Sequence, residues 1–181
     1  MNKWICNSSQ YVFQSPWFCI RQDELTLPTG EDFTYNILEH PGFAMLVPLL
    51  DDKRVVMERI YRYTLQRITL ECPSGKIERE QPEAAARREL EEETGYRAGT
   101  LKLLGKFAVF TGISNGLAYI FLATGLATDG ALQRENTEQI ELELIPLSDL
   151  RGRVLRGEIE DGPTALAILL ASEAVQQSTL D

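Results

Sequence analysis

The segment GKIEREQPEAAARRELEEETGY, from Gly75 to Tyr96, decides the fold and contains most of the residues that can do chemistry. Its second half is predicted to form a helix, because Pro82 suits a first helical position and a run of strongly helix-forming alanines follows it. Gly95 predicts the end of that helix, since glycine readily adopts the left-handed conformation found at helix ends. We therefore expect a single helix between Pro82 and Gly95.

Acidic side chains gather on one side of this helix. At about 100° per residue, Glu89, Glu92 and Glu93 fall within an arc of about 100°, whereas Glu91 points elsewhere. Like charges at such spacing destabilise an isolated helix unless a cation neutralises them. Converging carboxylate oxygens are ligands that Mg²⁺ or Mn²⁺ takes in proteins. The alternative interpretation of such an acidic run is a solvated face of glutamate and arginine.

The residues around the acids favour the metal site, because the whole segment resembles the signature of the Nudix hydrolases. That signature, or box, is Gly, five residues, Glu, seven residues, and then Arg-Glu-apolar-any-Glu-Glu-any-Gly-apolar. Arg88 to Gly95 match its second half in register, and the aromatic Tyr96 takes the last position. Glu80 stands seven residues before Arg88, but only four residues separate it from Gly75. The loop before the helix is therefore one residue shorter than in the family pattern.

The fold class predicted from the chain is α/β, a Nudix-type α/β/α sandwich with a mixed sheet and an N-terminal antiparallel β extension. Residues 1–40 are expected to form the extension, and residues 41–181 the hydrolase domain. Apolar or alternating runs predict strands, and two of them, 43–50 and 54–60, are expected to pair as a hairpin. The further strands are predicted at 69–72, 101–110, 118–126 and 139–145, with helices after residue 148 and from about 163 to 175.

Segments outside the box resemble the ADP-ribose pyrophosphatase-type Nudix enzymes. Tyr-Arg-Tyr at 61–63 and Glu-Cys-Pro-Ser-Gly at 71–75 are similar to that group's YR and E-x-P-[AS]-G elements, and residues 159–166 resemble the entry of its C-terminal helix. In that group the N-terminal extension helps to build a dimer whose subunits share the nucleotide base. Residues 111–116, TGISNG, depart from the group's Pro-Gly-x-Ser-Asp-Glu stretch, which leaves the nucleotide open.

The resemblance implies a Mg²⁺-dependent hydrolase, with Mn²⁺ as a possible substitute. It would cleave the diphosphate of a nucleoside diphosphate linked to X, with ADP-ribose or a related nucleotide sugar favoured, and release a nucleoside monophosphate and a phosphorylated product. The implied metal ligands are Glu89, Glu92, Glu93 and the carbonyl of Gly75.

The resemblance also implies the remaining members of the site. Arg88 would fix the orientation of a box carboxylate, and Glu80 holds the isolated glutamate position of the signature. The general base corresponds to Glu138, on a loop before the penultimate strand, with Glu135 and Glu141 as alternates. Each of these three acids is otherwise an ordinary surface residue.

Three further residues are candidates for substrate binding. Arg62 suits a diphosphate, because its planar guanidinium matches phosphate oxygens, although a surface arginine is the alternative. Trp17 is a candidate for stacking on the base, with Phe18 and Tyr35 as further possibilities, although aromatic residues more often belong to a core. Thr111 stands where the ADP-ribose group carries its marker proline.

Composition adds a few limits. The 181 residues are 44% apolar and 25% charged, as in one ordinary globular domain. A net charge of −9 argues against a nucleic-acid partner, and no apolar run of membrane-spanning length or signal peptide is seen. The three scattered cysteines indicate buried free thiols in a reducing cytoplasm, and the single His40 cannot form a Cys/His metal site.

Three rival functions remain open at this point. They are a hydrolase of GDP-mannose or another nucleotide substrate, a house-cleaning triphosphatase, and a non-catalytic nucleotide sensor. The intact acids of the box argue against the sensor, and the long N-terminal extension argues against the triphosphatase. We therefore expect a small-molecule nucleotide diphosphate as substrate and a homodimer as the assembly.

Overall fold

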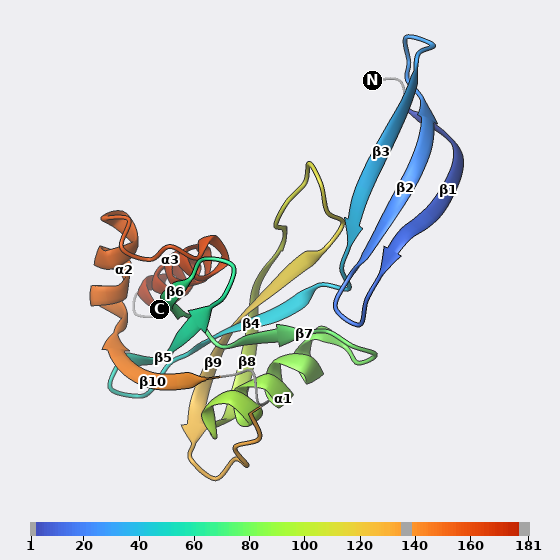
Figure 1. Ribbon diagram of the computed structural model, residues 1–181. Coiled ribbons are helices and arrows are strands. Elements are labelled where there is room, and N and C mark those ends of the chain that lie inside the picture. The colour runs from blue at the N-terminus through green and yellow to red at the C-terminus, as the bar shows by residue number, and fades with distance from the viewer. Residues whose placement is uncertain (1–2, 135–138, 178–181) are drawn as a thin grey trace. The chain divides into compact units, whose positions relative to one another are not determined.

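The computed structural model describes residues 3–134 and 139–177, which fall into two compact units. The first unit contains the chain up to Gly42 together with Phe107–Leu117, and the second contains Phe43–Lys106 and the chain from Ala118 onward. The first unit therefore includes a segment that lies far from the N-terminus in sequence. Each unit has its own β-sheet structure (Figure 1).

The first unit is built on an antiparallel sheet of three strands. These are β1 (Ile5–Gln14), β2 (Cys19–Thr26) and β3 (Asp32–Glu39), in the order β1-β2-β3. The segment Phe107–Leu117 lies along β3, because the backbone N–H of Leu38 donates to the carbonyl of Ile113 at 2.7 Å. The loop TGISNG, expected to connect two core strands, is thus also a neighbour of the N-terminal sheet.

The second unit contains two sheets. One is mixed, since β4 (Phe43–Pro48) pairs parallel to β9 (Leu117–Ala127) and antiparallel to β7 (Ser74–Lys76), with β8 (Arg97–Ala108) beyond β9. The other is antiparallel, with β5 (Arg54–Arg62) between β10 (Ile140–Pro146) and β6 (Arg67–Glu71).

The expected hairpin of residues 43–50 and 54–60 is wrong. The two segments do become the strands β4 and β5, but these strands belong to different sheets. The two segments pair only next to the turn, where Leu49 bridges to Val55 and the backbone N–H of Leu50 donates to the carbonyl of Arg54 at 2.8 Å. A short turn therefore leads the chain from one sheet into the other rather than back along the same sheet. The burial of β4 gives the reason. Its side chains are almost all buried, so both faces of the strand must be covered by other elements.

Three helices cover the sheets of the second unit. Helix α1 (Pro82–Thr94) packs on β4 and β7, and α3 (Gly162–Gln177) packs on β4 and against α2 (Leu147–Leu155) (Figure 1). Under α1, Ala44 and Leu46 of β4 form a buried cluster that fixes this helix on the sheet. Its other members are Ile77, Ala85, Ala86, Leu90, Phe121 and Ala123. No helix of the described chain is long and apolar enough to cross a membrane.

All three cysteines are free thiols, but they differ in burial. Cys72 is buried, Cys19 is half-buried and Cys6 is exposed. The expectation of buried thiols is therefore right only for Cys72. Burial raises the pKa of the Cys72 thiol, because the charged thiolate would lose its hydration there. This cysteine is a packing residue rather than a nucleophile.

Candidate active site

The box helix begins and ends where the sequence predicts. Pro82 occupies the first turn, and the preceding Gln81 is extended, with φ −71° and ψ 150°, and makes no side-chain cap. Gly95 closes the helix with φ 71°, and its backbone N–H donates to the carbonyl of Glu91. Because a left-handed residue at this position turns the chain sharply, the helix ends immediately after its acidic residues.

Two of the box acids face the strand β7 and are buried. Glu89 is 8% exposed and Glu93 is 5% exposed. The Oε2 atom of Glu93 accepts a hydrogen bond of 3.0 Å from the backbone N–H of Ser74. Glu89 lies against Gly75 so closely that a Cβ atom there would be 1.8 Å from the Glu89 carboxyl carbon. The absence of a side chain at position 75 therefore makes room for this carboxylate.

Arg88 is the centre of an ionic cluster on the same side of the helix. Its Nη1 lies 2.7 Å from Oε1 of Glu89 and donates to Oε2 of Glu92 at 2.9 Å. Its Nη2 donates to Oε1 of Glu80 at 2.9 Å and to the carbonyl of Lys76 at 3.2 Å. Partial burial acts to lower the pKa of Arg88, but its carboxylate partners outweigh this effect and raise the pKa. One guanidinium thus neutralises several acids.

Glu80 reaches Arg88 although the loop before the helix is one residue short. The hydrogen bond from Arg88 holds the pKa of the Glu80 carboxyl below its usual range, so this acid remains charged. The loop and the helix are tied together through this pair and through the bond from Arg88 to the carbonyl of Lys76. The short loop therefore still places an acid beside the box helix.

The oxygen-bearing groups near the box helix are of the chemical types that bind a divalent cation. The carboxylates of Glu89, Glu92 and Glu93 come from one helix, and the backbone of Gly75 lies against the first of them. In the described part of the chain, however, no three His, Cys, Asp or Glu side chains converge closely enough to hold a metal ion as they stand. The guanidinium of Arg88 bonds two of these acids instead. A bound cation would therefore replace Arg88 as the partner of at least one carboxylate.

The predicted general base lies outside the described residues, as does its alternate Glu135. Glu141, the other alternate, lies in β10 opposite Arg59 of β5 and is exposed. The residue before this gap is Arg134, whose Nε donates to the carbonyl of Glu93 and whose Nη1 donates to the carbonyl of Ile140, both at 2.7 Å. No residue pattern in the sequence points to a role for Arg134.

Arg62, predicted to contact the diphosphate, forms a two-point ion pair. Its Nε and Nη2 donate to the Glu71 carboxylate at 2.9 and 2.6 Å, while the hydroxyl of Thr69 donates to the same carboxylate. The bond to Glu71 raises the pKa of Arg62, and the charges of Asp161 and Glu93 add to the effect. The fixed guanidinium is therefore close enough to Glu93 to feel the charge of that box acid.

The other predicted substrate residues belong to the first unit. Trp17 is 62% exposed in the connection between β1 and β2, and Thr111 is exposed in the segment Phe107–Leu117. Phe18 packs on Phe13, with ring centroids 5.5 Å apart, and Tyr35 packs on an aromatic cluster of the same sheet. The second unit thus brings together the box residues and Arg62, whereas the aromatic candidates lie in the N-terminal unit.

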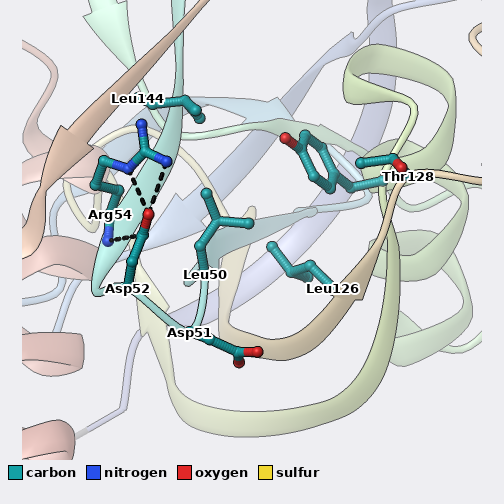
Figure 2. Close-up of a pocket in the computed structure, with 8 residues that line it drawn as sticks. Leu50, Asp51, Asp52, Arg54, Leu126, Thr128 and Leu144 are labelled. Carbon is teal, nitrogen blue, oxygen red and sulfur yellow. Dashed lines mark hydrogen bonds and ion pairs between the residues drawn. The ribbon is translucent and has the colours of Figure 1, made fainter.

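A surface pocket of about 370 Å³ lies in the second unit (Figure 2). On one side of it, Arg54 is paired with Asp52, and the rest of the wall combines leucine side chains with polar residues. Its remaining lining residues are Leu50, Asp51, Tyr96, Leu126, Thr128 and Leu144. Only Tyr96 belongs to the box, and no carboxylate of the ionic cluster lines the pocket. This pocket is therefore not the predicted reaction site.

Comparison with known proteins agrees with the position of the box. Residues 40–166 match the model of the NUDIX domain. The chain belongs to the Nudix family. Residues 4–38 match a second model, described as the nucleoside diphosphate sugar hydrolase N-terminal domain. The Nudix model thus spans the box, Arg62 and the residues on both sides of 135–138.

Relatives of the Nudix chain extend over most of its length. It is 31% identical to an ADP-ribose pyrophosphatase of Bacillus subtilis (strain 168), over 93% of this chain and 94% of the relative. It is 33% identical to an ADP-ribose pyrophosphatase of Mycobacterium tuberculosis, over 93% of this chain and 82% of the relative. The predicted enzyme class, a Nudix pyrophosphohydrolase, is confirmed.

A solved structure confirms the predicted α/β fold class. The crystal structure of an ADP compounds hydrolase superposes with a TM-score of 0.86, covering 98% of this chain and 97% of the other. The two chains are only 22% identical, so this likeness concerns the fold alone. The mixed sheet, the covering helices and the N-terminal antiparallel strands are the features of the fold that the sequence predicted.

Proposed function

We propose that this Nudix chain hydrolyses the diphosphate bond of ADP-ribose or a closely related nucleotide sugar, with Mg²⁺ as cofactor. The observation that carries the proposal is the match to two ADP-ribose pyrophosphatases over 93% of the chain, on a helix that keeps Glu89, Glu92 and Glu93. The N-terminal match to a nucleoside diphosphate sugar hydrolase domain supports the same substrate class.

The box residues would hold the metal ion. Glu89, Glu92 and Glu93, with the backbone carbonyl of Gly75, are its proposed ligands, and Mn²⁺ is a possible substitute. When bound, the ion offsets the charge of the diphosphate and lowers the pKa of a water molecule. The Ser74 N–H donates to one oxygen of Glu93 and so helps to fix the orientation of this carboxylate.

Charged residues around the acids would keep these ligands in place. Arg88 holds Glu92 and Glu89 in defined rotamers, and Glu80 holds Arg88 from the other side. Because Glu80 is anchored through Arg88, its effect on the reaction is expected to be one of positioning. The same pairs reduce repulsion on a chain whose net charge is −9.

The reaction requires a base and a contact to the diphosphate. We assign the base to Glu138: it would take a proton from the attacking water as the water oxygen bonds to phosphorus. The phosphorus–oxygen bond to the leaving group then breaks, which gives a nucleoside monophosphate and a phosphorylated product. Arg62, held by Glu71, would donate to phosphate oxygens, since guanidinium groups suit them. Trp17 and Thr111 are assigned to the nucleotide end of the substrate.

A homodimer in the cytoplasm completes the proposal. Large apolar side chains are exposed on the N-terminal unit, including Trp4, Phe13 and Phe33, which suits a surface that a second copy covers. Small-molecule substrates need neither nucleic acid nor membrane as partner. Light scattering at several protein concentrations measures the assembly directly, and a monomer at every concentration would contradict it.

One substrate screen tests the function. The purified chain is incubated with Mg²⁺ and ADP-ribose, NADH, GDP-mannose, diadenosine polyphosphates or dGTP, and release of nucleoside monophosphate is measured. We expect ADP-ribose to be the best substrate and Glu93→Gln to lower its kcat at least about 100-fold. Preference for GDP-mannose would support the alternative nucleotide-sugar substrate, which the altered segment 111–116 leaves open. Preference for dGTP would indicate a triphosphatase, and tight binding without turnover would indicate a sensor.

A further inference from the structure

The C-terminal turn of α1 has an unfavourable distribution of charge. Its last residues include Glu91, Glu92 and Glu93, and no basic residue occurs in its last turn. The C-terminal end of a helix carries a partial negative charge and leaves backbone carbonyls without partners inside the helix. Acids at this end are therefore destabilising, and the proposed metal ligands lie there. Some other part of the chain must compensate for them.

The segment from Gly130 to Arg134 supplies the missing partners. The N–H of Gln133 donates to the carbonyl of Glu92 at 2.9 Å, and the N–H of Ala131 donates to the side chain of Glu91 at 3.1 Å. The N–H of Gly130 donates to the carbonyl of Gly95 at 3.1 Å. This segment is thus bonded along the end of the helix.

Arg134 completes the arrangement with a positive charge. Its Nε donates to the carbonyl of Glu93 at 2.7 Å, at the negative end of the helix, where a cation is favourable. Its Nη1 donates at 2.7 Å to the carbonyl of Ile140, the first residue of β10. Ile140 in turn pairs with Ile60 of β5. A single guanidinium therefore joins the end of the acid-bearing helix to the second sheet.

We propose that Arg134 is a positioning residue for the hydrolysis reaction. It fixes the backbone of Glu93 from the carbonyl side while Ser74 fixes the carboxylate, so that this acid is held from both of its ends. It also fixes the chain at Ile140. The inference rests on the proposed function of Glu93 as a metal ligand, and it assigns no contact between Arg134 and the substrate.

Two substitutions at position 134 separate its charge from its two-point geometry. Arg134→Met keeps the length of the side chain but removes both the donors and the charge, whereas Arg134→Lys keeps the charge on a single donor group. The matched control is Arg97→Met, because Arg97 is an exposed arginine near the same helix end, 3.4 Å from Asp129 and 4.0 Å from Glu91. Thermal unfolding of each variant checks the fold.

Three measurements are compared in these variants. For Arg134→Met we expect kcat to fall by about 10- to 100-fold with KM within about twofold, and Mn²⁺ affinity to weaken by about 10-fold. In the metal-free protein, hydrogen exchange of residues 91–95 should become faster. In all three measurements, the values for Arg134→Lys should lie between those for Arg134→Met and the wild type. The values for Arg97→Met should match those of the wild type.

The outcomes distinguish this inference from the proposed function. Wild-type Mn²⁺ affinity and exchange in folded Arg134→Met would overturn the positioning role. Equal effects in Arg97→Met would also overturn it, since they would show that the loss of any positive charge near this helix end has the same result. If the wild-type chain hydrolyses no diphosphate, the proposed function fails, while the exchange and Mn²⁺ measurements still decide the role of Arg134. If Arg134→Met does not fold, the same measurements are made on Arg134→Lys, and wild-type Mn²⁺ affinity and exchange in that variant would overturn the positioning role.

Discussion

Replacing Gly75 by alanine tests whether the close approach of strand β7 to the box helix serves the reaction. A Cβ atom at this position would lie 1.8 Å from the carboxyl carbon of Glu89 and 2.0 Å from its Oε1. Carbon atoms in contact are normally at least about 3.5 Å apart, so the carboxylate would have to move by about 1.7 Å. Because Glu89 is buried and paired with Arg88, its carboxylate cannot simply move out into solvent.

The size of this displacement sets the expected effect. A misplacement of about 1 Å can cost about 100-fold in rate, so kcat of Gly75→Ala should fall by at least about 100-fold. Mn²⁺ affinity should weaken with it, since the displaced group is a proposed ligand. Inserting a methyl group into a tight site costs about 1–3 kcal/mol of unfolding free energy, which should leave the protein folded.

The assay is steady-state hydrolysis of ADP-ribose combined with Mn²⁺ titration and thermal unfolding. Gly162→Ala is the control, because a Cβ atom at that position meets nothing within 4 Å. In a Glu89→Gln background, Gly75→Ala should add little further loss, because both changes act on the same carboxylate. Wild-type turnover and metal affinity in Gly75→Ala would refute the reasoning.

Three further predictions concern individual acids. Glu93→Gln should lower kcat at least about 100-fold with the fold intact, and near-normal turnover of the purified variant would exclude α1 as the metal platform. Glu80→Gln should lower the rate by about 10- to 100-fold. The folded-state pKa of Glu80 lies below its ordinary value of 4.5, so its charged form stabilises the fold fully above pH 4.5 and less as the pH falls through the lowered pKa. The unfolding free energy of Glu80→Gln should therefore depend less on pH below 4.5 than that of the wild type. An unchanged pH dependence would contradict the pairing of Glu80 with Arg88. Glu138→Gln should lower kcat by about 10²–10⁴ with KM and Mn²⁺ affinity nearly unchanged, and a loss in Glu135→Gln alone would move the base by three residues.

The sequence predicted those parts of the molecule that depend on local chemistry. Pro82 and Gly95 determine the ends of the box helix through backbone geometry, and both ends are observed. Spacing along the helix also predicted which side carries Glu89 and Glu93 and that Glu91 points elsewhere. Glu91 indeed bonds to Ala131 rather than to Arg88. Such features need no information about distant segments.

The sequence did not predict the features that depend on contacts between distant segments of the chain. The strands β4 and β5 are separated by a short turn, and only their partners in other parts of the chain show that they lie in different sheets. The segment Phe107–Leu117 belongs with β3 for the same reason. Arg134 was not assigned because its two partners are backbone carbonyls, and any residue type provides these. A bond to a carbonyl leaves no pattern in the sequence.

The ionic cluster around Arg88 has a consequence for how the enzyme responds to chelation. Its acids already have a built-in counterion, since one guanidinium bonds Glu80, Glu89 and Glu92. Removing a bound cation would therefore expose no set of repelling charges, and the helix would persist in the stripped protein. Any cation must in turn compete with this internal counterion, so its apparent affinity reflects a difference between two attractions rather than the full attraction of the carboxylates. If the proposed metal site is correct, the free cation concentration would switch catalysis off and restore it without a cycle of unfolding.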